Sequence, residues 1–553
     1  MIELEMKVSG MTCDSCAMHI REVLEKVPGV RTASVSYPEA TARVTGEAGA
    51  KPEALIAAVT GLGYRAKLAD VPPGAKSGGL ENATAGDTEP DILIVGAGSA
   101  AFSAAITAAE SGARVVMAGE GVIGGTCVNV GCVPSKTLIR AMQAIHDGKA
   151  ASRFDGVNGA SSVFDWKALV RQKQALVEHL RQTKYRDLLP EYPNITYVKA
   201  RARFTGNGAE VEVDSTLYHP KKVILATGST STLPPINGIQ GVPVLDSTKA
   251  LELETLPKSL LVIGGGIIGC ELGQMFARAG VKVTICCRSR LLPHAEPEVC
   301  EALTGYLRQE GVTVCQGVGY QKIEQTGNGV ALTCQTAEGE RVIEAEQVLA
   351  ATGRQPNTKS LHLEKAGVAL NGRGGIAVND YMQTSHPEVY AVGDVTGQDM
   401  FVYMAAYGGK LAAKNALDGN THRYNNETMP SVVFTDPQVA AAGLTEAGAK
   451  AQGLDVKTRL LSLNNVPRHI AARDPRGFIK LVADSRTDRL LGATVMAPEA
   501  GDSIQTVVMA LTGGLTTGEL ADTIFPYLTA VEGIKLAAQA FKKDVKKLSC
   551  CAG

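Results

Sequence analysis

The stretch DILIVGAGSAA, residues 91–101, decides the fold of most of this chain. Its apolar residues are typical of a buried strand, and glycines follow at once, before an alanine-rich helix. Missing side chains let a pyrophosphate approach the N–H groups at the positive end of such a helix. We therefore expect Gly96, Gly98 and Ala101 to form a dinucleotide-binding turn. Glycines also mark ordinary turns, so the flanking strand and helix are what give this motif its weight.

A second copy of the pattern, LLVIGGGIIG, occupies residues 260–269. It again follows an apolar strand and precedes a helical segment and another strand. Gly264, Gly266 and Gly269 are the expected contacts with a second cofactor. Two such units in one chain predict two bound dinucleotides.

The residues at the end of the next strand distinguish the two cofactors. Glu120 follows this strand in the first unit and is predicted to accept a hydrogen bond from a ribose 2′-hydroxyl. In the second unit the strand ends in CCRSR, residues 286–290, which contains no acid. Arg288 and Arg290 suit a 2′-phosphate, which favours NADP over NAD. The alternative is two solvated surface arginines.

Two cysteines five residues apart lie in GGTCVNVGCVPSK, residues 124–136. A thiolate is both a nucleophile and a soft metal ligand, and the start of a helix lowers the pKa of a thiol. We expect Cys127 and Cys132 to be a redox pair beside the first cofactor. The alternative is a chance pair of cysteines in a glycine-rich turn.

This segment closely resembles the active-site motif of the pyridine nucleotide-disulfide oxidoreductases, flavoenzymes that pass electrons from a nicotinamide through FAD to a cysteine pair. The resemblance runs from about residue 91 to the C-terminus and includes ATG at 226–228, ATGR at 351–354 and VGD at 392–394. It implies that FAD and NADPH are the cofactors. It also implies that Cys132 lies against the flavin and that Cys127 faces the substrate.

The same resemblance assigns further residues. Lys136 and Glu271 would form an ion pair near the flavin N5, and Asp394 would bind the FAD ribitol. Ile267 stands where many relatives have a tyrosine, and Gly119 stands where the family usually has its ribose acid. The other cofactor contacts expected from these motifs are Thr126, Gly228 and Arg354.

One departure from the family decides the substrate. Disulfide reductases typically carry a His-Pro segment and then a glutamate near the C-terminus, where the histidine protonates a departing thiol. This chain reads FPYLTA at residues 525–530, with Phe525 and Ala530 in place of that pattern. A thiolate-bound metal ion receives electrons rather than protons. The departure therefore predicts a metal substrate, and Hg(II) suits both two thiolates and a two-electron reduction.

Two further cysteine pairs lie near the ends of the chain. Cys13 and Cys16 belong to GMTCDSC, residues 10–16, which closely resembles the motif of heavy-metal-associated domains. A thioredoxin-like redox use is the competing interpretation, and the segment is too short for that fold. Cys550 and Cys551 are expected to collect the metal and deliver it to the inner pair, unless they are an incidental terminal pair. The three pairs together suggest a thiol relay.

The remaining six of the twelve cysteines receive no function from the sequence. They lie in apolar or mixed patterns, where cysteine usually acts as a small buried hydrophobic residue. They are Cys270, Cys286, Cys287, Cys300, Cys315 and Cys334.

The predicted fold class is α/β, with two Rossmann-like domains, a C-terminal α+β dimerisation domain and, at the N-terminus, a small βαββαβ ferredoxin-like domain. A Pro-, Gly- and Ser-rich stretch predicts a flexible linker after the small domain. The predicted boundaries are 1–69 heavy-metal-associated domain, 70–89 linker, 90–236 FAD-binding domain, 237–355 NADPH-binding domain, 356–428 second part of the FAD-binding domain, and 429–553 dimerisation domain with the cysteine tail.

Composition restricts the partners. Lys plus Arg number 55 against 56 for Asp plus Glu, and without a long basic run this balance disfavours nucleic acid. The acidic N-terminus is unlike a signal peptide, and no apolar run reaches membrane-spanning length, so we expect a soluble cytoplasmic protein. Expected partners are Hg(II), small thiols and a membrane mercury transporter. In relatives the C-terminal domain forms a dimer whose sites are shared between subunits.

The combined expectation is an NADPH-dependent flavoenzyme that reduces Hg(II) to Hg(0), with the metal passed between cysteine pairs. The alternatives are a disulfide reductase such as dihydrolipoamide dehydrogenase and a metal-trafficking protein with a vestigial flavin core. From the resemblance, Tyr185 and Tyr527 would flank the ion, although ordinary packing of two tyrosines is an equal alternative. The expected catalytic residues are Cys127, Cys132, Cys550, Cys551, Lys136, Glu271, Tyr185 and Tyr527.

Overall fold

The computed structural model describes residues 2–9, 14–36, 41–46, 51–68, 88–206 and 208–544. Contacts divide the chain into two compact units, Met1–Glu81 and Asn82–Gly553. Among the helices in these ranges, none combines the length and the apolar character that crossing a membrane requires.

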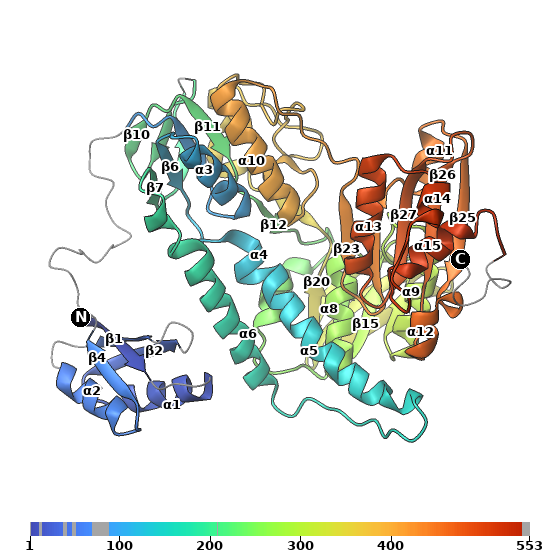
Figure 1. Cartoon of the computed structure of the whole chain (residues 1–553), viewed down its shortest axis with the longest axis horizontal. Helices are drawn as coiled ribbons and strands as arrows, with labels where there is room; N and C mark the ends of the chain where they lie inside the picture. The colour runs from blue at the N-terminus through green and yellow to red at the C-terminus, as the bar shows by residue number, and fades with distance from the viewer. Residues whose placement is uncertain are drawn as a thin grey trace. The chain divides into compact units, whose positions relative to one another are not determined.

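The first unit is a four-stranded antiparallel sheet with two helices (Figure 1). The sheet order is β2–β3–β1–β4. Met6 and Val8 alternate along β1 and pack against Ile20 and Leu24 of α1, which recur at helical spacing. The βαββαβ order predicted from the sequence is confirmed. Its elements are β1 (Ile2–Ser9), α1 (Asp14–Leu24), β2 (Val30–Ser36), β3 (Thr41–Gly46), α2 (Pro52–Thr60) and β4 (Arg65–Leu68).

A five-stranded parallel sheet of order β22–β11–β5–β6–β7 opens the second unit. Its strands are largely apolar because both faces are covered. Ile92 and Ile94 of β5 pack toward α3 and α10, whereas Leu93 and Val95 pack toward the small sheet β8–β9–β10. The elements are β5 (Ile92–Val95), α3 (Ser99–Glu110), β6 (Val115–Ala118), β7 (Ile195–Val198), β8 (Ala202–Phe204), β9 (Val211–Val213), β10 (Thr216–Tyr218), β11 (Lys222–Leu225), β22 (Val389–Ala391) and α10 (Val402–Asp418).

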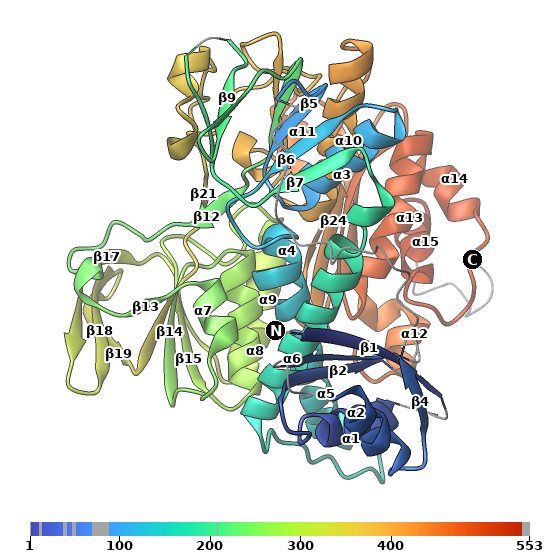
Figure 2. The same ribbon diagram turned by 90° about the vertical axis from the view of Figure 1, so that its left-hand side faces the viewer.

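A second parallel sheet, of order β13–β20–β14–β15–β16, repeats this plan. Helices α8 and α9 cover one face, and the antiparallel sheet β17–β18–β19 covers the other (Figure 2). The elements are β13 (Val244–Leu245), α7 (Ser247–Glu252), β14 (Ser259–Ile263), α8 (Ile267–Arg278), β15 (Lys282–Cys286), α9 (Pro297–Gln309), β16 (Thr313–Cys315), β17 (Gly319–Thr326), β18 (Gly329–Thr336), β19 (Gly339–Ala345) and β20 (Gln347–Ala350).

The two parallel sheets are joined by helices and by a two-stranded connection. Helix α5 packs against both α6 and α8, and β12 pairs antiparallel with β21 where the chain passes between the two sheets. Two glycine-rich turns lead into α3 and α8, as the sequence predicts. The joining elements are α4 (Gly125–Val130), α5 (Cys132–Ala150), α6 (Trp166–Arg181), β12 (Ser229–Ser231) and β21 (Arg354–Pro356).

The C-terminal part is an antiparallel sheet of order β23–β24–β27–β26–β25 with helices packed on it. This mixed arrangement agrees with the α+β class expected for the region. The elements are β23 (Pro430–Val433), β24 (Gln438–Gly443), α11 (Glu446–Ala451), β25 (Val456–Ser462), α12 (Pro467–Ala471), β26 (Phe478–Asp484), β27 (Leu490–Ala497), α13 (Ala500–Gly513), α14 (Thr517–Asp522) and α15 (Glu532–Gln539).

Phe276 offers a test of the core beneath the second parallel sheet. Its side chain is fully buried on α8, with its ring 6.1 Å from that of Trp166, the chain's single tryptophan. We expect Phe276→Ala to lower the free energy of unfolding by about 3–5 kcal/mol because it leaves a cavity. Urea denaturation followed by Trp166 fluorescence measures this change. The matched control is Phe164→Ala, because Phe164 is 99% exposed; equal losses in both variants would contradict the assignment.

Candidate functional site

Cys127 and Cys132 lie on consecutive helices separated by Gly131. Cys127 lies in α4, directly after the exposed Thr126 in the sequence. Cys132 is the first residue of α5. Both thiols are free and partly buried. A hydrogen bond donated by the Cys127 thiol lowers the pKa of Cys132 to about 7; the charge of Lys136 adds to this effect, against the cost of burial. The same bond raises the pKa of Cys127, as does burial. Cys132 is therefore the thiolate of the pair.

Lys136 connects the helix that carries Cys132 to α8 and to the segment after β23. It lies one turn after Cys132 on α5, on the same helix face. Its Nζ is 2.7 Å from Oε2 of Glu271, whose side chain is 3% exposed on α8. The other carboxylate oxygen, Oε1, accepts the backbone N–H of Phe434 at 2.8 Å, and Lys136 Nζ lies 4.8 Å from the Phe434 ring centroid. The ion pair expected between Lys136 and Glu271 is thus present.

Asn129 fixes the loop between the two cysteines. Its amide nitrogen donates to the carbonyl oxygens of Ile123 at 2.9 Å and Gly125 at 2.7 Å. Its side-chain oxygen accepts a hydrogen bond from Nε of Arg181 on α6 at 2.6 Å. Asn129 was not among the predicted site residues. Its only sequence signal is its place between two cysteines, because Arg181 reaches it from α6 through the tertiary fold.

Tyr185 lies beside the cysteine pair on a π-helical turn, η2 (Gln182–Arg186). Its ring packs edge-on against Phe102, with centroids 4.9 Å apart, and borders Gly124. Burial raises its pKa most, and the charges of Cys127 and Cys132 add to the effect. Single π-helical turns occur often at functional sites. Tyr185 therefore lies near the inner pair, and its role beside an ion stays a prediction.

Tyr403 is a second aromatic residue near Cys132 that the sequence analysis missed. It lies in the first turn of α10, stacks on Phe401 at a centroid distance of 5.4 Å, and donates a hydrogen bond to the carbonyl of Pro430. Burial raises the pKa of Tyr403 to about 12, with contributions from Asp399 and Cys132. No motif of the sequence marks it, since α10 reaches the pair only through the tertiary fold.

The two glycine motifs adopt the same backbone path. Gly96 has φ +145° and Gly264 has φ +118°, a region that side chains disfavour. A Cβ at Gly96 would lie 2.3 Å from the carbonyl oxygen of Ala226, and one at Gly264 would lie 2.3 Å from that of Ala351. Only glycine permits this close crossing between each strand end and its neighbour.

The helices that follow these glycines present free N–H groups. Helices α3 and α8 begin after Gly98 and Gly266, and no side chain caps either start. A Cβ at Gly266 would meet no atom within 4 Å, and one at Gly98 would meet only Gly125, at 3.6 Å. Ala101 is fully buried, and a Cβ at Gly269 would lie 2.1 Å from the Gly264 carbonyl. Both turns therefore fit a pyrophosphate.

Asp394 belongs to a polar group at the carboxyl edge of the first sheet. Ser229 Oγ donates to Asp394 Oδ2 at 2.6 Å. Arg354 binds the same serine twice, through Nε to Oγ at 2.8 Å and through Nη2 to the carbonyl oxygen at 2.6 Å. Gly228, with φ +72°, makes the turn into β12. These contacts fix the direction of Asp394.

The residues predicted to distinguish the two cofactors lie at the two corresponding strand ends. Glu120 follows β6 and is exposed, paired with Arg201 at 3.0 Å. Arg288 is exposed just after β15. Arg290 donates to the carbonyls of Pro293 and Ala295, and it lines a cavity of about 470 Å³ beside α9. Both arginines thus lie at the carboxyl edge of the second sheet.

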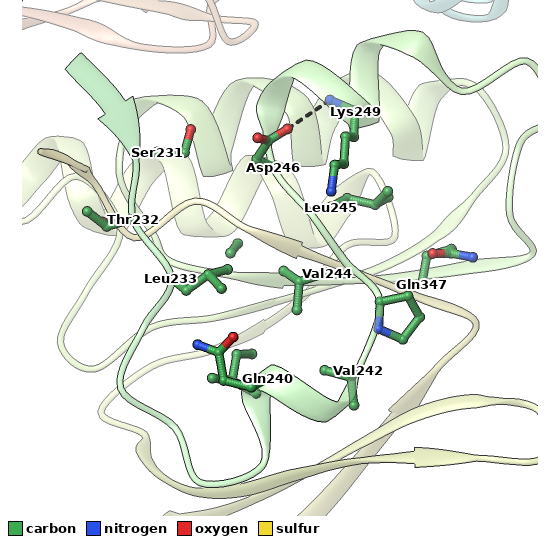
Figure 3. A pocket seen from close by; sticks show the side chains of 13 residues that line it. Ser231, Thr232, Leu233, Gln240, Val242, Val244, Leu245, Asp246, Lys249 and Gln347 are labelled. Atoms are coloured by element: carbon green, nitrogen blue, oxygen red, sulfur yellow. Dashed lines mark hydrogen bonds between the residues drawn. The ribbon is translucent and has the colours of Figure 1, made fainter. Parts of the chain in front are cut away.

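A cavity of about 440 Å³ lies between β12, β13 and β20, and Cys127 and Cys132 do not line it. Leu233, Val244 and Asp246 are among its lining residues (Figure 3). None of the residues predicted for a site lines it. We assign it no role.

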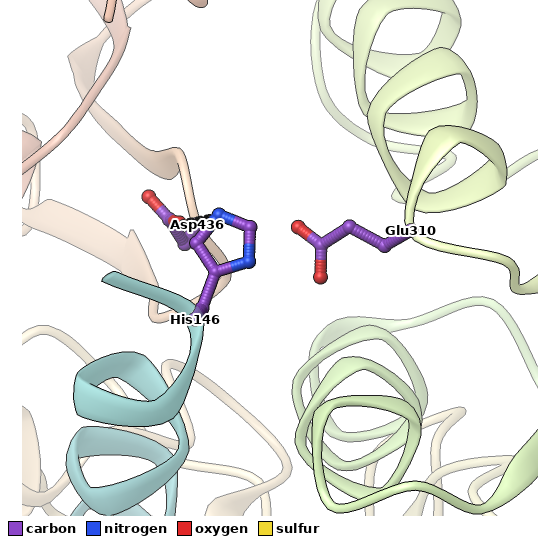
Figure 4. Close-up of side chains that lie close together, drawn as sticks. All are labelled: His146, Glu310 and Asp436. Carbon is purple, nitrogen blue, oxygen red and sulfur yellow. Dashed lines mark ion pairs between the residues drawn. The ribbon is translucent and has the colours of Figure 1, made fainter. Parts of the chain in front are cut away.

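His146, Glu310 and Asp436 are the one group of three or more potential metal ligands within 4.8 Å of one another among the described residues (Figure 4). Arginines already neutralise its acids. Arg278 Nη2 lies 2.7 Å from both Glu310 and Asp436, and Arg476 Nη2 lies 3.0 Å from Asp436. Burial and the charge of Arg278 lower the pKa of His146. This group is a structural ion-pair network between α5, α9 and the β23–β24 loop.

Residues 525–530 of the C-terminal part contain no histidine, as the sequence analysis noted. Tyr527 is 47% exposed, and the N–H of Leu528 donates to Oε2 of the largely buried Glu532 at 3.1 Å. The predictions for the outer thiols and for most of the linker concern residues outside the described ranges. The outer thiols are Cys13, the side chain of Cys16, Cys550 and Cys551.

Comparison with known proteins agrees with this geometry. Residues 90–409 match the family described as pyridine nucleotide-disulphide oxidoreductase, residues 429–538 match its dimerisation domain, and residues 5–65 match the heavy-metal-associated domain. A mercuric reductase from Shigella flexneri is 45% identical, covering 99% of this chain and 100% of that protein. One from Acidithiobacillus ferrooxidans is 43% identical, covering 99% of each.

Solved structures give the same fold. The Cu(II) complex of the HOCl-induced flavoprotein disulfide reductase RclA from Escherichia coli has a TM-score of 0.72 at 30% identity, covering 82% of this chain and 100% of that one. LpdA from Mycobacterium tuberculosis has a TM-score of 0.72 at 25% identity, covering 82% and 99%. The chain therefore belongs to the pyridine nucleotide-disulphide oxidoreductase family and, within it, to the mercuric reductases.

Proposed function

We propose that this chain is an FAD- and NADPH-dependent enzyme that reduces Hg(II) to Hg(0). The observation that carries the proposal is the Cys127–Cys132 pair, with its thiolate at the start of α5 and Lys136 one turn away. Mercuric reductases match the chain over its full length, and residues 525–530 contain no histidine. Two sulfurs that lack the histidine by which disulfide reductases protonate a departing thiol suit a soft metal ion better than a disulfide.

Family membership gives the enzyme a flavin and a pyridine nucleotide. We assign FAD to the first glycine turn and NADPH to the second, because only the second strand end offers two arginines for a 2′-phosphate. The proposed FAD contacts are Gly96, Gly98, Ala101, Glu120, Thr126, Lys136, Gly228, Arg354 and Asp394. The proposed NADPH contacts are Gly264, Gly266, Gly269, Arg288 and Arg290.

The inner cysteines bind the ion by ligand exchange. Cys132 enters as a thiolate, and Cys127 gives its proton to one of two departing solution thiolates, so one thiol and one thiolate leave. FAD and NADPH, when bound, supply the two electrons that convert Hg(II) to Hg(0). Release of Hg(0) leaves both cysteines as thiolates, and the charge of Lys136 stabilises them. Tyr185 and Tyr527 flank the ion in this proposal.

The outer cysteines extend this path. The match to a dimerisation domain indicates a homodimer, and we propose that Cys550 and Cys551 deliver Hg(II) to the inner pair of the other subunit. Cys13 and Cys16 of the heavy-metal-associated domain collect the ion, either from small thiols or from a membrane mercury transporter. The proposed location is the cytoplasm, where thiols stay reduced.

A substrate comparison tests the reaction. The full-length enzyme should oxidise NADPH anaerobically with Hg(II) in excess thiol. It should do so far more slowly with oxidised glutathione or oxidised lipoamide, because residues 525–530 lack the histidine that would protonate a departing thiol. Cys127→Ala/Cys132→Ala should lose the activity, whereas Cys270→Ala/Cys300→Ala, which alters two other buried thiols, should keep it. Rapid disulfide turnover without Hg(II), or no turnover at all, would overturn the proposal.

The pH dependence of the inner pair is a second prediction. With the pKa of Cys132 at about 7, its alkylation by iodoacetamide should be fast above pH 7 and fall as the pH drops below 7, since only the thiolate reacts. Cys127→Ala removes the donated hydrogen bond and should slow Cys132 alkylation at pH 7 by about tenfold. Peptide mass spectrometry measures the rates. A midpoint above pH 8 in the unsubstituted enzyme would count against this prediction.

Mixed dimers test delivery between subunits. Cys127→Ala subunits are combined with Cys550→Ala/Cys551→Ala subunits, each inactive alone under thiol competition. If the tail acts in trans, one of the two sites in each heterodimer has an intact inner pair and an intact tail, so about half of the activity should return. Delivery within one subunit predicts no recovery, and that result would sink the idea.

A further inference from the structure

Two thiols outside the proposed path are brought together by the second parallel sheet. Cys286 ends β15, Cys315 ends β16, and the two residues are directly paired in the parallel ladder. Neighbouring strands lie about 4.8 Å apart, and directly paired side chains leave the same face of a sheet. The Cys286 thiol donates a hydrogen bond to Cys315. The pair is therefore preformed by backbone register.

The surroundings of this pair favour a thiolate on Cys315. The hydrogen bond from Cys286 holds the pKa of Cys315 below its usual range, and the charges of Arg341 and Arg308 contribute. Arg341 Nη1 lies 3.8 Å from the Cys315 sulfur. Cys334 stands behind this arginine, with its thiol 3.4 Å from the Arg341 carbonyl oxygen. This arrangement repeats the chemistry of the Cys127–Cys132 pair, in which one thiol supports the charge of the other.

An ion can reach the pair from one side. Strand β16 is the edge strand of its sheet, so Cys315 has no further strand beside it. Cys315 is 8% exposed, whereas Cys286 is fully buried behind it. Arg341 is itself exposed and covers the sulfur with a long, flexible side chain. Rotation of that side chain opens Cys315 without any change in the sheet.

We propose that Cys286 and Cys315 form a second soft-metal site, which holds one two-coordinate ion such as Ag(I), Cu(I) or Hg(II). The pair offers only two ligands, because the one larger group of close metal ligands among the described residues is His146, Glu310 and Asp436. Structural zinc takes four ligands, so the site excludes it. Thiolate sulfur selects soft ions.

Binding at this site is ligand exchange without electron transfer. An Ag(I) ion held by two solution thiolates forms two new bonds, to the sulfurs of Cys286 and Cys315. One departing thiolate takes the Cys286 proton and leaves as a thiol, and the other leaves as a thiolate. The pair lies between β15 and β16, whereas the inner pair lies on α4 and α5. Our proposal is that an ion here is held without being reduced, because the site does not include the Cys127–Cys132 pair.

Silver binding tests the site without NADPH. The starting variant, called the parent, carries alanine at all six cysteines of the three pairs that the proposed function uses. Flavin retained by this parent shows that it has folded. With glutathione in excess, we expect one Ag(I) per chain after gel filtration, measured by elemental mass spectrometry. Adding Cys286→Ala/Cys315→Ala should remove this equivalent, and adding Cys270→Ala/Cys300→Ala should not. Absence of silver in the parent, or equal behaviour of the two variants, would overturn the proposal. The substituted residues are Cys13, Cys16, Cys127, Cys132, Cys550 and Cys551.

A measurement on the unsubstituted chain covers the case in which a variant misfolds. Labelling by N-ethylmaleimide is followed peptide by peptide as Ag(I) increases. Cys315 labelling should slow at least tenfold once the site fills, whereas labelling of the buried Cys300 should not change. Unchanged labelling of Cys315 at saturating Ag(I) would refute the site. Neither result depends on whether the enzyme reduces Hg(II).

Discussion

The buried ion pair between Lys136 and Glu271 holds three separate parts of the site in one place. An ionised carboxylate with 3% exposure costs several kcal/mol unless charge and hydrogen bonds compensate it. Lys136 of α5 supplies the charge, and the N–H of Phe434 supplies a hydrogen bond from the C-terminal part. Because Cys132 lies one turn before Lys136, the requirement to pair Glu271 also sets the position of the reactive thiol.

The Cys127–Cys132 and Cys286–Cys315 pairs stabilise a thiolate in the same way. In each, a protonated cysteine donates to its neighbour, so a single charge is shared by two sulfurs and supported by a nearby cation. Their surroundings differ. Cys127 and Cys132 lie at a helix junction fixed by Asn129. Cys286 and Cys315 are held in a rigid sheet. Both sulfurs at the helix junction are partly exposed, whereas in the sheet Cys286 is fully buried behind Cys315.

The glycine-rich turns could be predicted from the sequence because neighbouring residues in the chain determine them. Gly96 and Gly264 follow buried strands, and the turns predicted there are present, with positive φ values at both glycines. Residues joined only by the tertiary fold were not predictable. Tyr403 reaches Cys132 through the packing of α10, and Cys286 meets Cys315 through strand register. Sequence patterns correctly placed these last two cysteines in the core, but burial carries no information about which thiol faces which.

The protonation states around the inner pair explain why a metal ion suits this site. Burial raises the pKa values of Tyr185 and Tyr403, so both hydroxyls keep their protons at neutral pH. Lys136 is committed to Glu271. The Cys132 thiol, with a pKa of about 7, therefore changes its protonation near neutrality, whereas the two tyrosines do not. Disulfide reduction requires an acid that gives up a proton at that pH, whereas thiolate exchange on a soft ion requires only the proton that Cys127 already holds.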